Sequence, residues 1–595
     1  TGRVEATVSV GDGPNSIGAA AASLWVANEF DDSITAIDPT TEIAEPAVRV
    51  GGAPASITTD GDGLWLAVGA SAAVHRGGTL TVSSSKRAPK SLDPAIVVFN
   101  DTLGGQILAI TNDGLLSYDK VGGPSGATLV PDLASTLPEI STDRLTYRFP
   151  LRQGISYSTG EPVRPEDFRY AVERLFAMGA EAAGGFKTID GAKACIVEPS
   201  TCDLSGSIVA DAEAVTFHLV RPDPELPYKL ALPVTYPVPV ETPAKDQGLE
   251  PVPATGPYMI AEAGADGVEL VRNPEFREWS GAAQPDGFVD AISWRFGQDP
   301  ANAFDRLSAG ELDWMTDVPQ PEDLASLEAE HPDQVVHSPT AITYWIGFNA
   351  LAPPFDDPRV RQALNYVIDR NHVVELHGGP SSYRLTCQVL PPNFQGYEPF
   401  CPYTLDPGSG AWSAPDPDRA HALIEDAGAM GEKVTVLMTE DPREAAIMRY
   451  IVEVLNELGL RANPKIVSTF DQKLVSINTG EAQAYLGGWI SNYPTASDFI
   501  KPKHLCSPAI HDGWGPYSGF CSESLNAKFE DALRLQETDP AAANSAWAEL
   551  DHQIVEEAIV APVDNPVSTF AVSARVGNIQ VHPQWGILPT RLWVQ

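Results

Sequence analysis

Strand and helix patterns alternate through the later part of the chain, and this alternation constrains the fold more than any other feature. The stretches Val434–Met438 and Arg461–Val467 read as strands. Arg443–Leu458 places apolar residues on one helical face, and Phe470–Ile477 is predicted to form a second helix. Strands that alternate with helices favour a β-sheet covered by helices. We therefore predict an α/β fold class.

Residues 484–499 contain the best candidate for a ligand-binding surface. An apolar strand passes through Gly487 and Gly488 to Trp489 and then breaks into a polar turn. Glycines at a strand end let another backbone approach closely, and the tryptophan offers a large flat face beside them. A strand that simply ends in a proline-containing turn is the alternative interpretation.

The length and charge of the chain limit its class. A chain of 595 residues exceeds the size of one hydrophobic core, so we expect two to four domains. Its 79 acidic and 39 basic residues give a formal net charge of −40, which argues against nucleic acid and anionic membranes as partners. No apolar run approaches the roughly 18 residues of a membrane-spanning helix. Because the sequence begins at Thr1 with neither an initiator methionine nor a signal sequence, we expect a processed or truncated product.

The six cysteines lie in three close pairs along the sequence. Of the roughly fifteen possible pairings, this grouping favours local disulfides, with six buried thiols as the alternative. Disulfides persist in oxidising compartments, so we place the protein outside the cytoplasm. No cysteine has the CxxC spacing typical of structural zinc. The favoured pairs are Cys195–Cys202, Cys387–Cys401 and Cys506–Cys521.

Residues 1–70 repeat. Val10–Pro14 recurs as Val50–Pro54, and Ser23–Ala27 recurs as Gly63–Ala67, both at an offset of 40. That period is typical of a four-stranded propeller blade, and the segment resembles YVTN-type β-propeller repeats of cell-surface proteins. A closed propeller needs several blades, so either further repeats lie upstream or these strands pack as an appendage.

From residue 77 onward, a series of short motifs occurs in one order. The motifs are Leu92-Asp93-Pro94, the run Leu145–Leu175 containing "FPLRQGISYSTGEPVRPEDF", "ATGPY" at Ala254–Tyr258, "VRNPEF" at Val271–Phe276, "GELD" at Gly310–Asp313, "YWIGFNALAPPFDDPRVRQALNYVIDR" at Tyr344–Arg370, and "GWISNYP" at Gly488–Pro494. In this order they resemble the family 5 extracellular solute-binding proteins, the dipeptide and oligopeptide receptors of ABC importers.

The resemblance implies a two-lobed fold like that of type II periplasmic binding proteins, of the large peptide-binding class with an extra subdomain. A short all-β repeat segment would precede it. Residues 77–297 with 556–595 would form the first lobe, in which 117–215 would be the extra subdomain. Residues 298–555 would form the second lobe. The return to the first lobe would pass through Ala558–Pro562, whose apolar run suits a buried crossing strand.

The resemblance also implies where a ligand binds. In peptide-binding relatives the strand that ends at the tryptophan pairs with the main chain of the ligand, and a carboxylate three residues later holds its amino terminus. Here that position is Asn492, which puts a free amino terminus in doubt because an amide carries no charge. Asp498 would replace the charge or cap the next turn, and Arg384 would meet a ligand carboxylate. The expected ligand-binding residues are Gly487, Gly488, Trp489, Ile490, Ser491, Asn492, Tyr493, Asp498, Phe99, Asn100, Tyr344, Trp345 and Arg384.

Motifs of catalysis are missing from the sequence. It contains no G-x-S-x-G elbow, H-E-x-x-H pair, phosphate-binding loop or dinucleotide fingerprint, so we expect no enzyme, no cofactor and no metal. His504 and His511 come nearest to a metal pair. We expect a monomeric receptor at the cell surface, tethered to the membrane by a segment outside this sequence. It would capture a peptide or peptide-like solute by hinge closure and deliver it to an ABC permease. A ligand-sensing domain of a larger signalling protein is the alternative, and a hydrolase is a third hypothesis.

Overall fold

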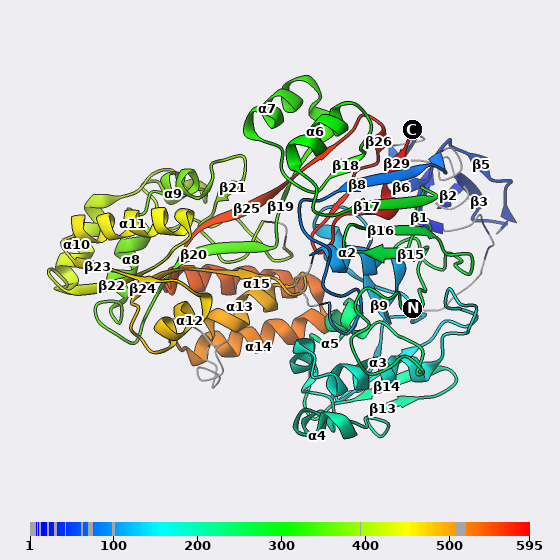
Figure 1. Ribbon diagram of the computed structural model, residues 1–595, viewed down its shortest axis with the longest axis horizontal. Coiled ribbons are helices and arrows are strands. Elements are labelled where there is room, and N and C mark those ends of the chain that lie inside the picture. The colour runs from blue at the N-terminus through cyan, green and yellow to red at the C-terminus, as the bar shows by residue number, and fades with distance from the viewer. Residues whose placement is uncertain are drawn as a thin grey trace.

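The computed structural model describes most of the chain (Figure 1). The description covers residues 8, 10, 14–20, 23–28, 32–41, 43–60, 63–69, 75–97, 102–392, 394–505 and 519–595. Phe99, Asn100, Cys506 and His511 therefore lie outside the described residues.

A twelve-stranded mixed sheet runs through the molecule and forms its frame. Along its main path the strands are β15 (Tyr258–Gly264), β16 (Gly267–Arg272), β17 (Ala291–Arg295), β8 (Thr79–Ser83), β18 (Trp314–Met315), β25 (Val560–Val572), β20 (Ile342–Phe348), β24 (Ala484–Ile490), β22 (Lys433–Thr439) and β23 (Arg461–Val467), while β19 (Val335–Pro339) and β21 (Tyr383–Leu385) pair with β25. We call β8 and β15–β18 the first part of the sheet, and β20 and β22–β24 the second part.

The long strand β25 joins the two parts. Its start pairs with β20, where Val560 lies opposite Gly347, and its end pairs with β18, where Val572 lies opposite Trp314. Val560–Asn565 are buried. The apolar run at Ala558–Pro562 thus leads into a buried strand that crosses between the two parts, as the sequence predicted.

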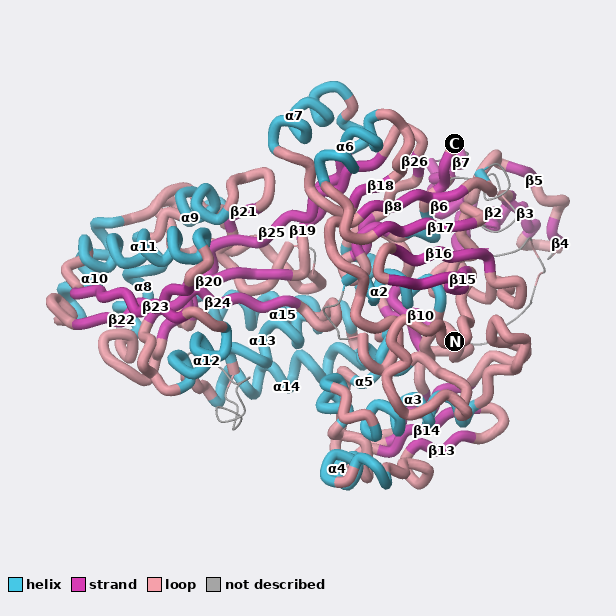
Figure 2. The backbone as a smooth tube through the Cα atoms, viewed as in Figure 1, coloured by secondary structure: helices cyan, strands magenta, loops and turns pink. Residues whose placement is uncertain are grey.

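Helices surround the second part, whereas the first part consists mainly of strands and loops (Figure 2). Four helices of the second part begin with an Asp-Pro pair, in which the aspartate caps the first turn and proline fits its first position. The helices predicted at Arg443–Leu458 and Phe470–Ile477 are confirmed. The helices are α8 (Pro358–Val367), α9 (Arg370–His377), α10 (Pro417–Ala427), α11 (Pro442–Glu457), α12 (Phe470–Asn478), α13 (Ala496–His504), α14 (Glu523–Thr538) and α15 (Pro540–Glu556).

A four-stranded sheet below the first part forms a separate layer, which we call the β12 subdomain (residues 139–229; Figure 1). Helix α3 (Pro165–Ala177) packs on it, with proline at its first position. The buried Arg174 of α3 pairs with Asp93, at 2.5 Å between Nη2 and Oδ2, so the Leu-Asp-Pro motif anchors this layer. Its other elements are β11 (Glu139–Ile140), β12 (Thr146–Pro150), β13 (Ile208–Ala210), β14 (Ala214–His218), α4 (Ala192–Val197) and α5 (Leu226–Lys229).

The remaining helices and short strands pack around the first part of the sheet. Helix α2 covers Thr102–Thr111. The others are α6 (Pro300–Ser308), α7 (Pro321–Glu330), β9 (Leu116–Tyr118), β10 (Leu129–Pro131), β26 (Val576–Gly577), β27 (Val581–His582), β28 (Gly586–Ile587) and β29 (Trp593–Val594).

The N-terminal repeat has a structural counterpart. The pair β1 (Pro14–Ala20) and β2 (Ser23–Asn28) has the same register as β6 (Pro54–Asp60) and β7 (Gly63–Val68), shifted by 40 residues and with the register shift at the corresponding place. Strand β6 lies beside β1, where Asn15 donates to the Pro54 carbonyl at 3.0 Å. The first unit continues with β3 (Ser33–Asp38), β4 (Ile43–Ala44) and β5 (Val48–Arg49).

Two of the three expected disulfides are confirmed, Cys195–Cys202 and Cys387–Cys401. Cys521 is also disulfide-bonded, while its expected partner lies outside the described residues. Within the described ranges, no helix has the length and apolarity that a bilayer crossing requires.

Candidate functional site

Three cavities lie where the elements around the second part of the sheet meet the first part or the β12 subdomain. The strand pocket has a volume of about 270 Å³ and lies where Ile490 and Ser491 of the second part face Leu103 and Trp585 of the first. The charged pocket, of about 320 Å³, lies between the β12 subdomain and the start of α13. The apolar pocket, of about 360 Å³, lies between the same subdomain and α15. Cavities of this size suit small ligands or parts of larger ones.

Strand β24 extends beyond its neighbour β22. It pairs with β20 along its whole length, from Ile342 opposite Ile490 to Phe348 opposite Ala484. Its pairing with β22 involves Ala484 alone. The last residues of β24 therefore form an edge at this end of the sheet, next to the strand pocket, and an extended ligand can add to such an edge.

The two glycines of β24 make room for aromatic side chains of β20. A Cβ atom at Gly487 would lie 2.6 Å from Nε1 of Trp345, and one at Gly488 would lie 2.7 Å from Cδ1 of Tyr344. Both distances are shorter than van der Waals contact allows. The sequence interpretation, in which these glycines admit another backbone, did not anticipate this cross-strand packing.

Asp498 is the centre of a hydrogen-bond network at the end of β24. Its Oδ2 accepts from Nε1 of Trp489 at 3.1 Å and from the backbone N–H of Asn492 at 2.7 Å, while its Oδ1 accepts from Nδ2 of Asn492 at 3.0 Å. Burial raises the pKa of this carboxyl group to about 7, against the effect of the three hydrogen bonds. Asn492 thus contacts this buried carboxylate through both its backbone N–H and its side-chain amide.

Tyr493 connects the end of β24 to the β12 subdomain. Its hydroxyl group donates to Oε1 of Glu225 at 2.9 Å, and its ring stacks on Tyr228 with centroids 6.4 Å apart. Burial and the charge of Glu225 hold the pKa of Tyr493 well above its usual value. On the other side, Nε2 of Gln584 donates to the Asn492 carbonyl at 3.2 Å.

A second contact with the β12 subdomain involves Glu537 near the end of α14. Its carboxylate forms an ion pair with Arg144 and accepts from the hydroxyl group of Tyr147 at 2.9 Å. The side chains of Glu537 and Arg144 are 9% and 24% exposed. This contact binds α14 to the β12 subdomain independently of Tyr493.

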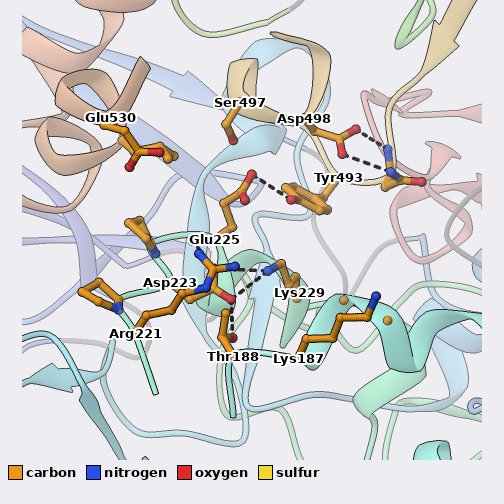
Figure 3. Close-up of a pocket in the computed structure, with 16 residues that line it drawn as sticks. Lys187, Thr188, Arg221, Asp223, Glu225, Lys229, Tyr493, Ser497, Asp498 and Glu530 are labelled. Carbon is orange, nitrogen blue, oxygen red and sulfur yellow. Dashed lines mark hydrogen bonds and ion pairs between the residues drawn. The ribbon is translucent and has the colours of Figure 1, made fainter. Parts of the chain in front are cut away.

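The charged pocket contains side chains of both signs (Figure 3). Lys229 pairs with Asp223 at 2.9 Å, and Asp223 also accepts from Thr188 at 2.7 Å. Lys187 and Arg221 lie on the other side of the pocket from Asp498 in this view. Among the described residues, neither of these two exposed cations has an ion-pair or hydrogen-bond partner for its side chain.

The structure brings five of the predicted site residues to two cavities. Ile490 and Ser491 line the strand pocket, and Asn492, Tyr493 and Asp498 line the charged pocket. Lys187, Arg221 and Glu225 were not predicted, because no local motif marks them and they come from a distant segment of the chain.

The other predicted residues have different surroundings. Trp345 is buried at 2% exposure in the core, and Tyr344 packs edge-on against His377 with ring centroids 4.9 Å apart. Arg384 lies exposed on β21 and donates to the Tyr383 carbonyl. The described residues contain no group of three potential metal ligands.

Comparison with known proteins agrees with this architecture. The family model of bacterial extracellular solute-binding proteins, family 5 middle, matches residues 128–509. Di/tripeptide-binding protein 2 of Pseudomonas aeruginosa is 24% identical and covers 87% of this chain and 96% of its own length. The glutathione-binding protein GsiB of Shigella dysenteriae is 24% identical, over 82% of this chain and 89% of its own.

Solved structures show the same fold. The clavulanic acid biosynthesis oligopeptide binding protein 2 superimposes with a TM-score of 0.75 at 24% identity, covering 87% of this chain and 96% of its own. A periplasmic murein tripeptide binding protein in its unliganded open form gives 0.71 at 21% identity, covering 87% and 97%. The fold is thus the two-lobed fold of the large periplasmic peptide-binding proteins, and because the family model matches more than half of the chain, the protein belongs to family 5 of the bacterial extracellular solute-binding proteins.

Proposed function

We propose that the protein captures a peptide or peptide-like solute between its lobes and delivers it to an ABC importer. One observation carries this proposal: the edge at the end of β24 lies between the two parts of the sheet, beside the buried carboxylate of Asp498. A strand edge recognises main-chain groups of any sequence, and a buried carboxylate orients an ammonium group. The names of the relatives, di/tripeptide-binding and oligopeptide-binding, support the same class of ligand.

The residues proposed to contact the ligand are those at the end of β24 and in the turn after it. Gly488 and Ile490 would present main-chain groups, Trp489 would support the ligand, and Asp498 would receive its amine. Phe99 and Asn100 remain predictions outside the described residues. Tyr344 and Trp345 support β24 through cross-strand packing, and nothing in their surroundings assigns them a ligand contact.

Calorimetric titration of trialanine into the protein tests the proposal. Trp489→Ala removes both the flat face and a hydrogen bond to Asp498, so we expect the dissociation constant to rise at least about tenfold, or about 1.4 kcal/mol. The control is Trp65→Ala, which changes a 67% exposed tryptophan of the N-terminal hairpin and should leave the affinity unchanged. Equal affinities in wild type and Trp489→Ala would remove β24 from the site.

Mass spectrometry of any ligand that co-purifies with the protein tests the ligand class directly. A peptide or peptide-like mass recovered unmodified after prolonged incubation supports binding without catalysis. A processed product would instead favour the hydrolase hypothesis.

We infer the domain limits from the sheet. The first lobe would comprise 77–297 with 556–595, including the extra subdomain at 117–215, and the second lobe 298–555. The path of β25 supports this division, because it starts in one part of the sheet and ends in the other. Closure would bend the segments that cross between the lobes.

The cellular setting is also a proposal. We infer a monomer at the outer face of the membrane, held there by a segment outside this sequence, with an ABC permease as partner. The repeated register of the two N-terminal hairpins supports their assignment as β-propeller-like repeats. In a larger protein such repeats would suit the alternative role as a sensor.

A further inference from the structure

We propose that the outer edge of β7, in the N-terminal repeat, receives a third strand from a further repeat of the same kind. The repeat has two units, β1 to β5 and then β6 with β7, and in it β7 corresponds to β2. The proposed occupant is an extended segment with the residue pattern of β3. This surface is separate from the three cavities described above, so the proposal does not depend on the solute.

The two units differ by one strand. In the first unit β2 lies between β1 and β3, and it pairs with β3 from Leu24 opposite Ile37 to Asn28 opposite Ser33. In the second unit β7 pairs with β6, and within the described ranges no strand pairs with its other edge. The described part of the second unit therefore has no counterpart of β3.

The segment that would supply this strand lies elsewhere. At the offset of 40 residues, positions 73–78 correspond to β3. His75 stacks on Trp593 near the end of the chain, with ring centroids 4.3 Å apart. The backbone N–H of Gly77 donates to the Phe288 carbonyl at 2.9 Å. This part of the segment therefore joins the first part of the large sheet rather than β7.

Equivalent positions of β2 and β7 differ in burial. Ala27 is fully buried, whereas its counterpart Ala67 is exposed. Val26 is 7% exposed, whereas its counterpart Leu66 is only half-buried. Trp65 is 67% exposed. A strand placed along β7 as β3 is placed along β2 would remove part of this apolar surface from water, which is favourable.

Strand β7 also lacks the residues that protect the edge of a sheet. Native edge strands commonly carry charges or proline, which hinder pairing with another chain. Strand β23, at one edge of the twelve-stranded sheet, follows this rule with Arg461, Pro464 and Lys465. Strand β7 has the sequence Gly-Leu-Trp-Leu-Ala-Val, with neither a charge nor a proline. An unprotected apolar edge suits the addition of a strand.

Main-chain hydrogen bonds show which groups of β7 face outward. The backbone N–H of Gly69 donates to the Ala53 carbonyl at 2.7 Å, so the main chain of Gly69 faces β6. Main-chain groups of an antiparallel strand point alternately to its two neighbours. Those of Leu64, Leu66 and Val68 therefore face the open edge.

Strand β3 shows which groups of the added strand would face β7. Thr35 lies opposite Val26, the counterpart of Leu66. The next residue, Ala36, points to the other side, where its carbonyl accepts from the backbone N–H of Glu45 at 2.8 Å. In an added strand of this sequence, the N–H of Thr35 would donate to β7 and the N–H of Ala36 would point away from it.

The test uses a fluorescent synthetic peptide with the sequence of Asp32–Thr40, titrated into the full chain. Fluorescence anisotropy measures the dissociation constant. N-methylation at Thr35 removes the N–H that faces β7, so it should weaken binding at least about tenfold. N-methylation at Ala36 is the matched control. It removes an N–H that points away from β7, so the dissociation constant should change less than about twofold.

Disulfide trapping locates the bound peptide. In the first unit Ala27 lies opposite Ile34, so in the same register Ala67 would lie opposite Ile34 of the peptide. Directly opposite residues have Cβ atoms close enough for a disulfide. Ala67→Cys should therefore react at least about tenfold faster with an Ile34→Cys peptide than with an Ala36→Cys peptide, which is two positions out of register. Val48→Cys is the control, since Val48 is 55% exposed on β5 of the same repeat.

Each outcome decides for or against the added strand. A selective loss with N-methyl-Thr35, together with preferred trapping at Ala67→Cys, supports it. Equal dissociation constants for the two N-methylated peptides overturn it, and so does a lack of binding by the unmodified peptide at about 1 mM. Equal reaction rates of Ala67→Cys with both cysteine peptides overturn it as well. Thermal melting of Ala67→Cys should match that of the wild type, because this side chain is exposed.

Discussion

The charged pocket and the apolar pocket lie between the same two walls, yet they are built differently. Both lie between the β12 subdomain and the helices α13 to α15, and both include Pro224. The apolar pocket extends the hydrophobic core, since Trp547 is 2% exposed and packs in the cluster that contains Phe529. The charged pocket instead buries the carboxylates of Asp498 and Glu225, which costs folding free energy. The difference predicts that substitutions in the apolar pocket lower stability, whereas the buried carboxylates of the charged pocket are themselves a cost to stability.

The largest expected effect is on stability, at Trp547. Its ring packs against Phe529 with centroids 5.4 Å apart, and its Nε1 donates to Gln536 at 3.2 Å. Trp547→Ala should lower the free energy of unfolding by about 3 to 5 kcal/mol, because it leaves a cavity in the core. Urea denaturation measures the change. Trp547→Phe, which keeps most of the packing, should lose less than half as much, and a loss below about 1 kcal/mol in Trp547→Ala would contradict a structural role for this pocket.

Replacing Asp498 should raise the free energy of unfolding rather than lower it, by an amount that depends on pH. Its pKa is about 7 when folded, above the ordinary value near 3.8, so between these pH values the unfolded chain has released a proton that the folded chain keeps. Rising pH therefore favours unfolding over this range. Relative to wild type, Asp498→Asn should gain stability from pH 4 to pH 7, by on the order of 2 to 4 kcal/mol, and the gain should level off above pH 7.

Urea denaturation of both proteins at several pH values checks this prediction. Taking the difference between the two proteins removes the contributions of all groups other than the side chain at position 498. If the difference in free energy of unfolding does not vary with pH, Asp498 has the same pKa in the folded and the unfolded chain. The prediction would then be wrong.

The next prediction concerns the contact between α14 and the β12 subdomain. Glu537→Gln removes the charge that faces Arg144 while keeping a hydrogen-bond acceptor for Tyr147. We expect the contact between α14 and the β12 subdomain to weaken by about 1 to 2 kcal/mol. Hydrogen exchange at residues 144–147 should become faster. Glu530→Gln on the same helix is the control, because Glu530 is exposed and has no ion pair within the described ranges.

Local features of the fold could be predicted from sequence. Helix α11 was found because the apolar residues of its buried face lie within one short stretch of the sequence. The two confirmed disulfides close loops with sequence separations of 7 and 14. Such features depend on neighbouring residues, so one sequence is enough to show them.

The site could be predicted only where it is local. The turn from Ile490 to Asp498 was found because its residues adjoin β24, whereas Glu225 lies 268 positions from Tyr493, its hydrogen-bond partner. No periodicity relates two such segments. The contact between Asn492 and Asp498 could not be predicted either, because the sequence does not show that this carboxylate turns back toward the strand.

The smallest expected effect concerns the rim of the apolar pocket. Leu137 and Ile140 line that pocket but are 49% and 37% exposed, so folding removes only part of their apolar surface from water. Leu137→Ser should therefore lower the free energy of unfolding by no more than about 1 kcal/mol, in contrast to Trp547→Ala in the same cavity. Urea denaturation of the two variants side by side measures this contrast. If Leu137→Ser loses as much stability as Trp547→Ala, the partly exposed residues of this pocket contribute as much to stability as the buried ones, and the prediction is wrong.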